Sequence, residues 1–285
     1  MLAVLAGAGW FLLGLLSLLV PTPDPRSAAM GFAVDALLGA AFVWAGVGSL
    51  LRRRWAPSMM LILAWSWLLG GALALVLAPG LIDGVLPPSS AGVASFVRLV
   101  VLGIIAFGGV LLPASFVWAY RDPDVQRTCE RNDPRPAWTE RCPTPVLGLS
   151  VGLGALAVLG LPMLARPVVP FFGLLLGGWA GALAIVVGAV ACAWLARESY
   201  RLTASGWWGS TILLVAVGAS TAVTLLRVDP PELYRRMGYP AEQVELLRGA
   251  ASGPLLAWIT VLLTLLSVGY MVAIHKHFRP GRPAA

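Results

Sequence analysis

The stretch CERNDPRPAWTERCP, which begins at Cys129, holds the densest set of reactive and polar side chains in an otherwise apolar chain. Cys129 and Cys142 stand near its two ends, and His275 and His277 follow the last apolar segment. Two thiolates and two imidazoles are ligand types that zinc prefers, but structural sites usually space paired cysteines by about two to four residues. Twelve residues separate these two cysteines. The spacing therefore leaves zinc as an alternative and favours a structural connector or a docking surface.

Two ionisable side chains fall inside apolar segments, Asp35 and Arg98. Charges within a membrane segment are costly and are usually paired or functional. Each lies about one turn from the outer end of its predicted helix, so the two residues are at similar depth and of opposite sign, and we predict a structural ion pair. In the alternative, Asp35 binds a substrate or couples proton transfer in a transporter, while Arg98 extends its guanidinium toward the membrane surface.

The remaining motifs point away from catalysis. Residues 148–152 read Gly-Leu-Ser-Val-Gly and match the GxSxG nucleophile pattern, but that motif needs a strand-to-helix turn. Here the motif lies within an apolar helical segment, and both histidines of the chain lie far away near its C-terminus. No P-loop, dinucleotide fingerprint or HExxH motif is present in the sequence. We expect no catalytic residues and no cofactor apart from the zinc alternative.

Composition indicates a membrane protein. The 285 residues are 59% hydrophobic and only 12% charged, with a mean hydropathy of +0.84. Soluble domains carry roughly 25% charged residues. The net charge of +7 is spread over many short loops, whereas a nucleic-acid groove would cluster it. Lipid is therefore the expected environment, and nucleic acid is not an expected partner.

Repeated apolar runs of about twenty residues predict an all-α, polytopic bundle of eight transmembrane helices in a single domain. Proline, charge or polar turns bound each run. The first run lacks the basic start of a signal peptide and is taken as a membrane helix. The predicted helices are 2–20, 30–51, 57–78, 95–120, 145–165, 170–196, 207–226 and 253–274.

Basic residues are unequally divided between the two sides of this bundle. Six lie on one side: Arg26, Arg166, Arg227, Arg235, Arg236 and Arg248. Cytoplasmic loops carry the excess of basic residues. We therefore expect both termini in the cytoplasm, in a bacterial inner membrane. The thirteen on the cytoplasmic side would be Arg52, Arg53, Arg54, Arg121, Arg127, Arg131, Arg135, Arg141, Arg197, Arg201, Lys276, Arg279 and Arg282.

Two loops and one glycine pattern complete the prediction. The cytoplasmic loop 121–144 would hug the membrane, with arginines on anionic headgroups, or would dock another protein. The outer loop 228–250 would form short amphipathic helices on the membrane surface. Small residues recur every fourth position at Gly173, Gly177 and Gly181, which predicts a flat stripe on helix 170–196. The stripe would serve packing within the bundle or a homo-oligomer contact.

Three function classes compete. A non-catalytic scaffold, sensor or assembly partner agrees best with the scarcity of polar groups inside the membrane segments and with the arginine-rich cytoplasmic loops. A small-molecule transporter that uses Asp35 is the alternative. A membrane-embedded enzyme would need a catalytic cluster, which the sequence does not supply.

Overall fold

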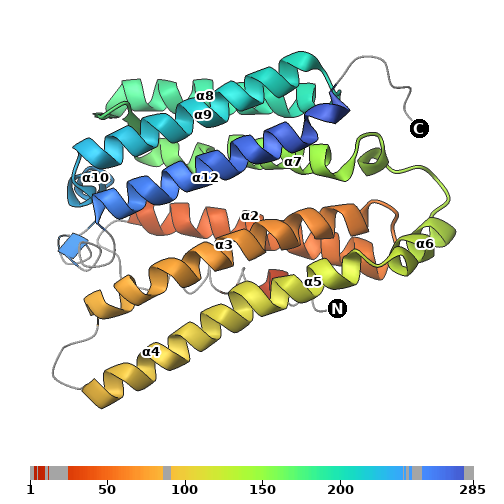
Figure 1. The fold of residues 1–285 in the computed structure, drawn as a ribbon, viewed down its shortest axis with the longest axis horizontal. Helices are drawn as coiled ribbons and strands as arrows, with labels where there is room; N and C mark the ends of the chain where they lie inside the picture. Colours follow the sequence, from red (N-terminus) through yellow and green to blue (C-terminus); the bar gives the residue numbers. More distant parts are fainter. Residues whose placement is uncertain are drawn as a thin grey trace. The chain divides into compact units, whose positions relative to one another are not determined.

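The computed structural model describes residues 3–4, 6–9, 12, 25–85, 91–239, 241, 244–245 and 252–278. The chain divides into two compact units. Unit 1 comprises Met1–Glu140 and Pro240–Ala251, and unit 2 comprises Arg141–Tyr239 and Ser252–Ala285. Each unit is described by itself, with its elements labelled in Figure 1.

Unit 1 is built around α3, which packs against both α2 and the rod formed by α4 and α5. A π-helical turn joins α4 to α5 without a break, so Figure 1 shows them as one long rod. Its elements are α2 (Pro25–Leu50), α3 (Ala56–Val85), α4 (Ala91–Ile105), the π-helix (Ala106–Leu111), α5 (Leu112–Tyr120), α6 (Pro123–Asn132) and a 3-10 turn (Trp138–Glu140).

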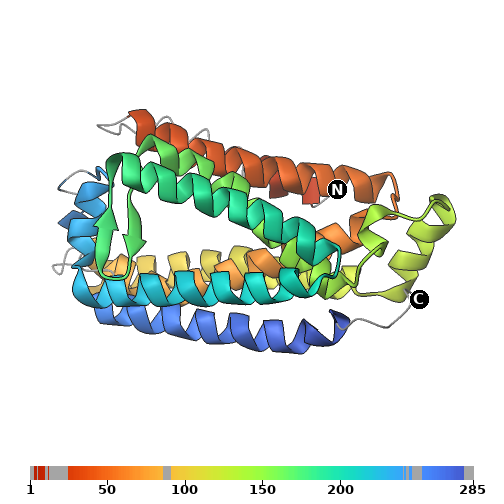
Figure 2. The same ribbon diagram turned by 90° about the horizontal axis from the view of Figure 1, so that it is seen from above.

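Unit 2 packs α8 against α7 and α9, and α9 in turn against α12. A β-hairpin precedes α8 and is visible at one end of that helix in Figure 2. A buried cluster that includes Leu153, Trp207 and Met271 forms its core. The elements are α7 (Thr144–Leu159), a 3-10 helix (Leu161–Ala165), β1 (Val169–Phe171), β2 (Leu174–Leu176), α8 (Gly178–Tyr200), α9 (Ala204–Arg227), α10 (Pro230–Arg236), α12 (Gly253–Ile274) and a 3-10 turn (His275–His277).

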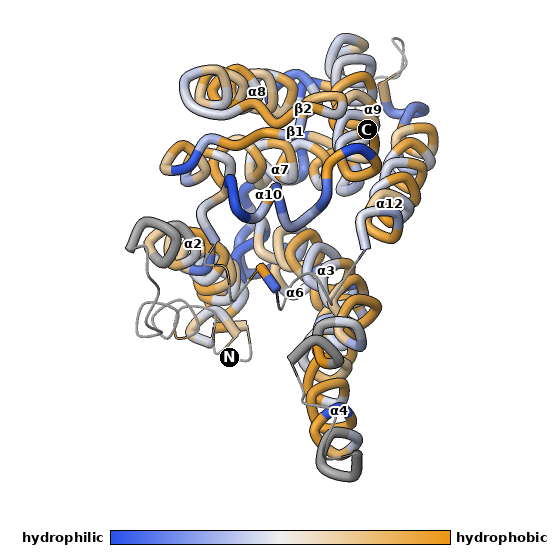
Figure 3. Tube along the Cα trace, turned by 90° about the vertical axis from the view of Figure 1, so that its left-hand side faces the viewer, coloured by the Kyte–Doolittle hydropathy of each residue, from blue (hydrophilic) through white to orange (hydrophobic). Residues whose placement is uncertain are grey.

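Among the described residues, seven helices are long and apolar enough to cross a membrane. Their tubes are largely orange in the hydropathy colouring of Figure 3. The all-α class is therefore confirmed, and the seven helices are compatible with a multi-pass membrane protein. Most of the predicted segment 2–20 lies outside the described residues, so the count of eight stays a prediction, as does the side of the termini. The seven are Gly31–Leu50, Ala56–Gly80, Ser95–Tyr120, Thr144–Ala165, Gly178–Tyr200, Ala204–Arg227 and Gly253–His277.

The predicted helix 170–196 needs a correction at its start. Residues Val169–Phe171 pair antiparallel with Leu174–Leu176, and α8 begins only at Gly178. Gly173 lies in the turn of this hairpin with φ +93°, and Gly177 is the extended N-cap residue of α8. Of the three glycines only Gly181 is helical, so the predicted stripe along one helix is wrong. An added Cβ at Gly181 would lie 2.2 Å from the carbonyl oxygen of Pro167, so this glycine serves packing within unit 2.

A close backbone approach in unit 1 joins α3 to the π-helix. A Cβ added at Gly71 would lie 1.8 Å from the carbonyl oxygen of Gly109. In lipid no hydrophobic effect drives helices together, so their association depends on close packing of this kind. The π-turn also precedes Pro113, which lacks an N–H to donate to the preceding turn. Two glycines and one π-turn thus allow α3 and the α4–α5 rod to touch.

We predict that Gly71→Ala destabilises the protein by about 1–3 kcal/mol, because the added methyl group collides with backbone that cannot rotate away. Gly70→Ala is the matched control, since nothing lies within 4 Å of a Cβ at that position. Thermal unfolding in detergent, followed by helical circular dichroism, measures both variants. Equal melting temperatures for the two would contradict the predicted contact.

Candidate functional site

The turn between α2 and α3 places three consecutive arginines at one end of unit 1. Arg52 adopts a left-handed conformation, with φ +52°. Its N–H bonds the carbonyl of Ser49, and the N–H of Arg53 bonds that of Gly48, at 3.1 and 2.8 Å. This Schellman pattern usually employs glycine at the left-handed position. Arg52 therefore occupies a position at which glycine would have a lower conformational energy.

The segment after α5 folds back onto this turn. Arg54 forms an ion pair with Glu140, and Arg53 approaches Asp133 with 3.7 Å between nitrogen and oxygen. The side-chain amide of Asn132 donates to the carbonyl of Leu51 at 3.3 Å. We call the turn Arg52–Arg54 together with the segment Arg121–Glu140 the arginine platform. These contacts show that the platform is an ordered cap on unit 1.

Helix α6 supplies the outer surface of the platform. Asp122 caps it by accepting from the N–H of Asp124 at 2.9 Å, and Pro123 occupies its first turn. Its inner face carries the buried Cys129. The exposed charged side chains of the platform are of both signs: Arg52, Arg53, Arg121, Asp122, Asp124, Arg127, Glu130, Arg131, Arg135 and Glu140.

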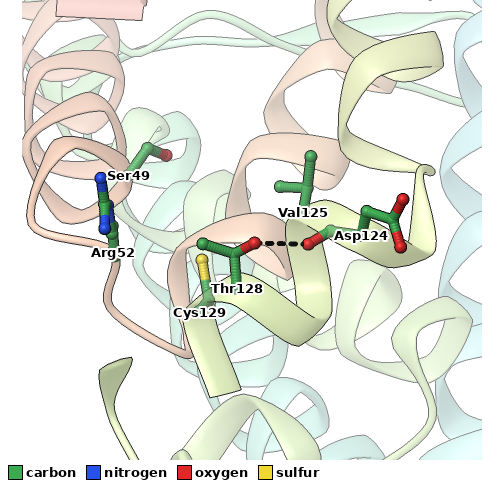
Figure 4. A pocket seen from close by; sticks show the side chains of 6 residues that line it. All are labelled: Ser49, Arg52, Asp124, Val125, Thr128 and Cys129. Atoms are coloured by element: carbon green, nitrogen blue, oxygen red, sulfur yellow. Dashed lines mark hydrogen bonds between the residues drawn. The ribbon is translucent and has the colours of Figure 1, made fainter. Parts of the chain in front are cut away.

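A shallow hollow of about 290 Å³ opens between α6 and the end of α2. Figure 4 shows Ser49 and Arg52 on one side of it, with Asp124 and Cys129 across from them. Val125 and Thr128 complete the lining, and the Thr128 hydroxyl donates to the carbonyl of Asp124 at 2.7 Å. The Arg52 guanidinium and the Asp124 carboxylate both border the hollow, so its walls carry charges of both signs.

The predicted zinc ligands are divided between the units. Cys129 belongs to unit 1, while Cys142, His275 and His277 belong to unit 2. Within the part of the chain that the structure describes, no three His, Cys, Asp or Glu side chains gather as a metal site requires. The two cysteines are free thiols. The zinc alternative therefore gains no support from the geometry.

Both juxtamembrane thiols are held in their neutral form. Burial raises the pKa of the Cys129 thiol, with Arg52 opposing the effect and Glu130 adding to it. Burial alone raises the pKa of Cys142 to about 11. At neutral pH only about one Cys142 side chain in ten thousand is then a thiolate. The thiolate is the form that attacks substrates and binds metals, so Cys142 is a poor nucleophile.

We predict that alkylation of Cys142 keeps accelerating, by about tenfold per pH unit, up to about pH 10. The measurement uses a small methanethiosulfonate reagent on protein in which Cys129 and Cys192 are replaced by alanine. The same protein unfolded in detergent provides the control, since its rate should level off near the ordinary thiol pKa. A plateau at or below pH 9 in the folded protein would contradict the raised pKa.

Asp35 and Arg98 lie on different helices of unit 1 that both pack against α3. Asp35 is half-buried on α2, and Arg98 is exposed on α4. The ion pairs of Arg53, Arg54 and Arg127 belong to the arginine platform. The ion pair of Asp35 with Arg98 stays a prediction.

The GxSxG serine has a structural role. Ser150 lies on α7, and its hydroxyl donates to the carbonyl of Ala196 on α8 at 2.7 Å. The hydrogen bond joins two packed helices, with no strand-to-helix turn nearby. The helical setting expected from the sequence is confirmed.

Unit 2 has an arginine-bearing end of its own. Arg197 and Arg201 end α8, and Leu202 forms a left-handed turn, with φ +59°, into α9. The Trp207 ring nitrogen donates to the carbonyl of Met271 at 2.8 Å, and its ring lies 4.5 Å from that of His275. The predicted cytoplasmic ends of α8 and α12 are therefore neighbours within this unit.

Two polar residues have a structural role that the sequence did not predict. Ser220 and Thr224, scattered polar residues of α9, bind the turn of the β-hairpin. The N–H groups of Phe172 and Gly173 donate to their hydroxyls at 3.0 Å each. Because they are four residues apart, both hydroxyls lie on one face of α9. That spacing is the feature of the sequence from which a common binding partner for the two could have been predicted.

No family model, no curated protein and no solved structure matches this chain.

Proposed function

We propose that this chain is a non-catalytic, multi-pass membrane protein that assembles with a partner protein through the arginine platform of unit 1. The observation that carries the proposal is the order of the platform. Ion pairs from Arg53 and Arg54, with the amide contact of Asn132, hold residues 121–140 against the α2–α3 turn. A connector that only linked two helices would not need such a structure.

The charge pattern favours a protein partner over a lipid surface. Segments that bind anionic headgroups carry four to eight basic residues in a cluster, and the platform holds seven arginines. Here, however, exposed acidic residues of α6 and its N-cap lie among Arg121, Arg127 and Arg131. A surface of mixed sign discriminates between partners by complementary charges and rejects mismatched ones. Anionic lipid remains the competing ligand, and the experiment below distinguishes the two.

The chemistry of the described side chains supports a non-catalytic role. The Cys142 thiol is protonated at neutral pH, and Ser150 is committed to a helix–helix hydrogen bond. An enzyme would need a nucleophile or base that is both activated and accessible. Neither group meets that requirement.

A photoreactive amino acid at Gln126, which is exposed on α6, tests the assembly directly. We expect irradiation of cells to produce a discrete protein adduct from this position. Replacement of Arg52, Arg121, Arg131 and Arg135 by glutamine should reduce the adduct several-fold, since charges at an interface rim accelerate association. Arg53 and Arg54 are left intact in this variant because they hold the platform together.

The same photoreactive group at Ser205, exposed at the start of α9, is the matched control position. It should give no adduct that depends on the four platform arginines. Adducts formed with lipid alone at Gln126 would contradict the protein partner, as would a protein adduct that survives the four substitutions unchanged.

A further inference from the structure

The hairpin of unit 2 exposes an apolar, aromatic surface. Val169 pairs with Leu176 and Phe171 with Leu174, and every residue from 169 to 176 is uncharged. Phe171 is 49% exposed, Phe172 48% and Leu174 65%. The two phenyl rings lie edge to face, 5.3 Å apart. A contiguous exposed surface of this kind marks contact with another protein or with lipid.

The tip of the hairpin holds an unusual conformation. Phe172 has φ +45° and Gly173 has φ +93°, which is the pattern of a two-residue hairpin turn. A bulky side chain in the left-handed region is a rare arrangement. Two strands of three residues are also too short to be stable alone. The hairpin therefore depends on external support, and it keeps an aromatic ring where glycine or asparagine would fit more easily.

Helix α9 provides that support through hydroxyl groups. Ser220 accepts from the N–H of Phe172 at 3.0 Å and donates to the carbonyl of Pro170 at 3.1 Å. Thr224 accepts from the N–H of Gly173 at 3.0 Å. Backbone N–H groups at a turn in water are solvated at no cost. Where water is absent they need partners from the protein, and here side chains supply both.

The supporting residues also fix the depth of the tip. Ser220 and Thr224 precede Arg227, the last residue of α9, by about two turns and about one turn, which places them roughly 10 and 5 Å inside the end of the apolar helix. The side chain of Arg227 packs over the turn, since a Cβ at Gly173 would lie 2.6 Å from its Cδ. The tip is thus level with the membrane-spanning part of α9, and a cation stands at its edge.

We propose that the hairpin 169–176 is inserted into lipid, at the end of unit 2 opposite to Arg197 and Arg201. Phe171, Phe172 and Leu174 contact acyl chains, and Arg227 lies at the level of the phosphates. Lipid is favoured over a protein partner because the hairpin carries no charge and leads directly into the lipid-facing helix α8, whose second residue, Trp179, is 81% exposed. This inference rests on the membrane embedding proposed above.

Spin labelling of purified full-length protein in phosphatidylcholine–phosphatidylglycerol vesicles tests the insertion. The label is placed at Leu174 in a variant with all three cysteines replaced by alanine. Two reference labels are used in the same background: Val217, 56% exposed in α9, and Arg236, exposed in α10. We expect the label at Leu174 to resemble that at Val217, with high access to oxygen and low access to a water-soluble nickel chelate.

Removal of the hydroxyl support gives an independent test. Ser220→Ala with Thr224→Val should raise the nickel access at Leu174 several-fold, because the turn loses its partners and leaves the lipid. Thr211→Val is the matched control on the same helix, since its hydroxyl donates only to the carbonyl of Trp207 within α9. No change at Leu174 in the double variant would overturn the role of the two hydroxyls.

The reference labels separate the ways in which the proposal can fail. Nickel access at Leu174 with lipid-like behaviour at Val217 would overturn the insertion and leave the membrane embedding intact. Low access of both oxygen and the nickel chelate to Leu174, together with spin–spin broadening, would overturn the insertion into lipid and indicate contact with a second copy of the protein. Nickel access at Val217 itself would remove the membrane embedding on which the inference rests.

Discussion

Lipid offers no hydrogen bonds, and every backbone donor and acceptor that enters it has to find a partner within the protein. That constraint explains why seven long apolar segments of the described chain are helices. It also explains the two places where the helical pattern changes. At Ala106–Leu111 the bonds shift to π spacing just before Pro113, and at Phe172–Gly173 the hydroxyls of α9 take over from backbone partners. Irregular backbone is tolerated where an internal partner exists.

Most charged residues lie at or beyond the ends of the long apolar helices, outside the segments that would lie in lipid. In unit 1 they gather at the α2–α3 turn and α6, where ion pairs from Arg53 and Arg54 tie the two together. In unit 2 the turn between α8 and α9 carries Arg197 and Arg201. Exposed ion pairs contribute little to stability. At the platform they join residues 121–140 to the α2–α3 turn, which gives the surface of mixed charge on which the proposed partner recognition rests.

Segment type was predictable from the sequence, but local geometry was not. Apolar runs of twenty residues identify α12 to the residue, whereas α9 begins three residues before its predicted start, directly after the polar N-cap Thr203. The hairpin escaped detection because its residues are as apolar as the helix that follows, although Pro170, Gly173 and Gly177 punctuate it. Pairing Asp35 with Arg98 required knowledge of which helices are neighbours, and α3 packs against both of theirs. The order of the platform depends on contacts about 80 residues apart, such as Asn132 to Leu51, which no local pattern encodes.

The central prediction is that the arginine-rich segments 121–141 and 197–201 are each cytoplasmic, as the excess of basic residues indicates. Single cysteines at Gln126 in unit 1 and Ser205 in unit 2, in a cysteine-free background, test it with a membrane-impermeant maleimide on intact bacterial cells. A cysteine at Arg236 on α10 serves as the opposite-side reference. Labelling of Arg236→Cys in intact cells, with labelling of the other two only after the membrane is opened, is the predicted result. Labelling of positions 126 and 205 from opposite compartments would contradict the arrangement.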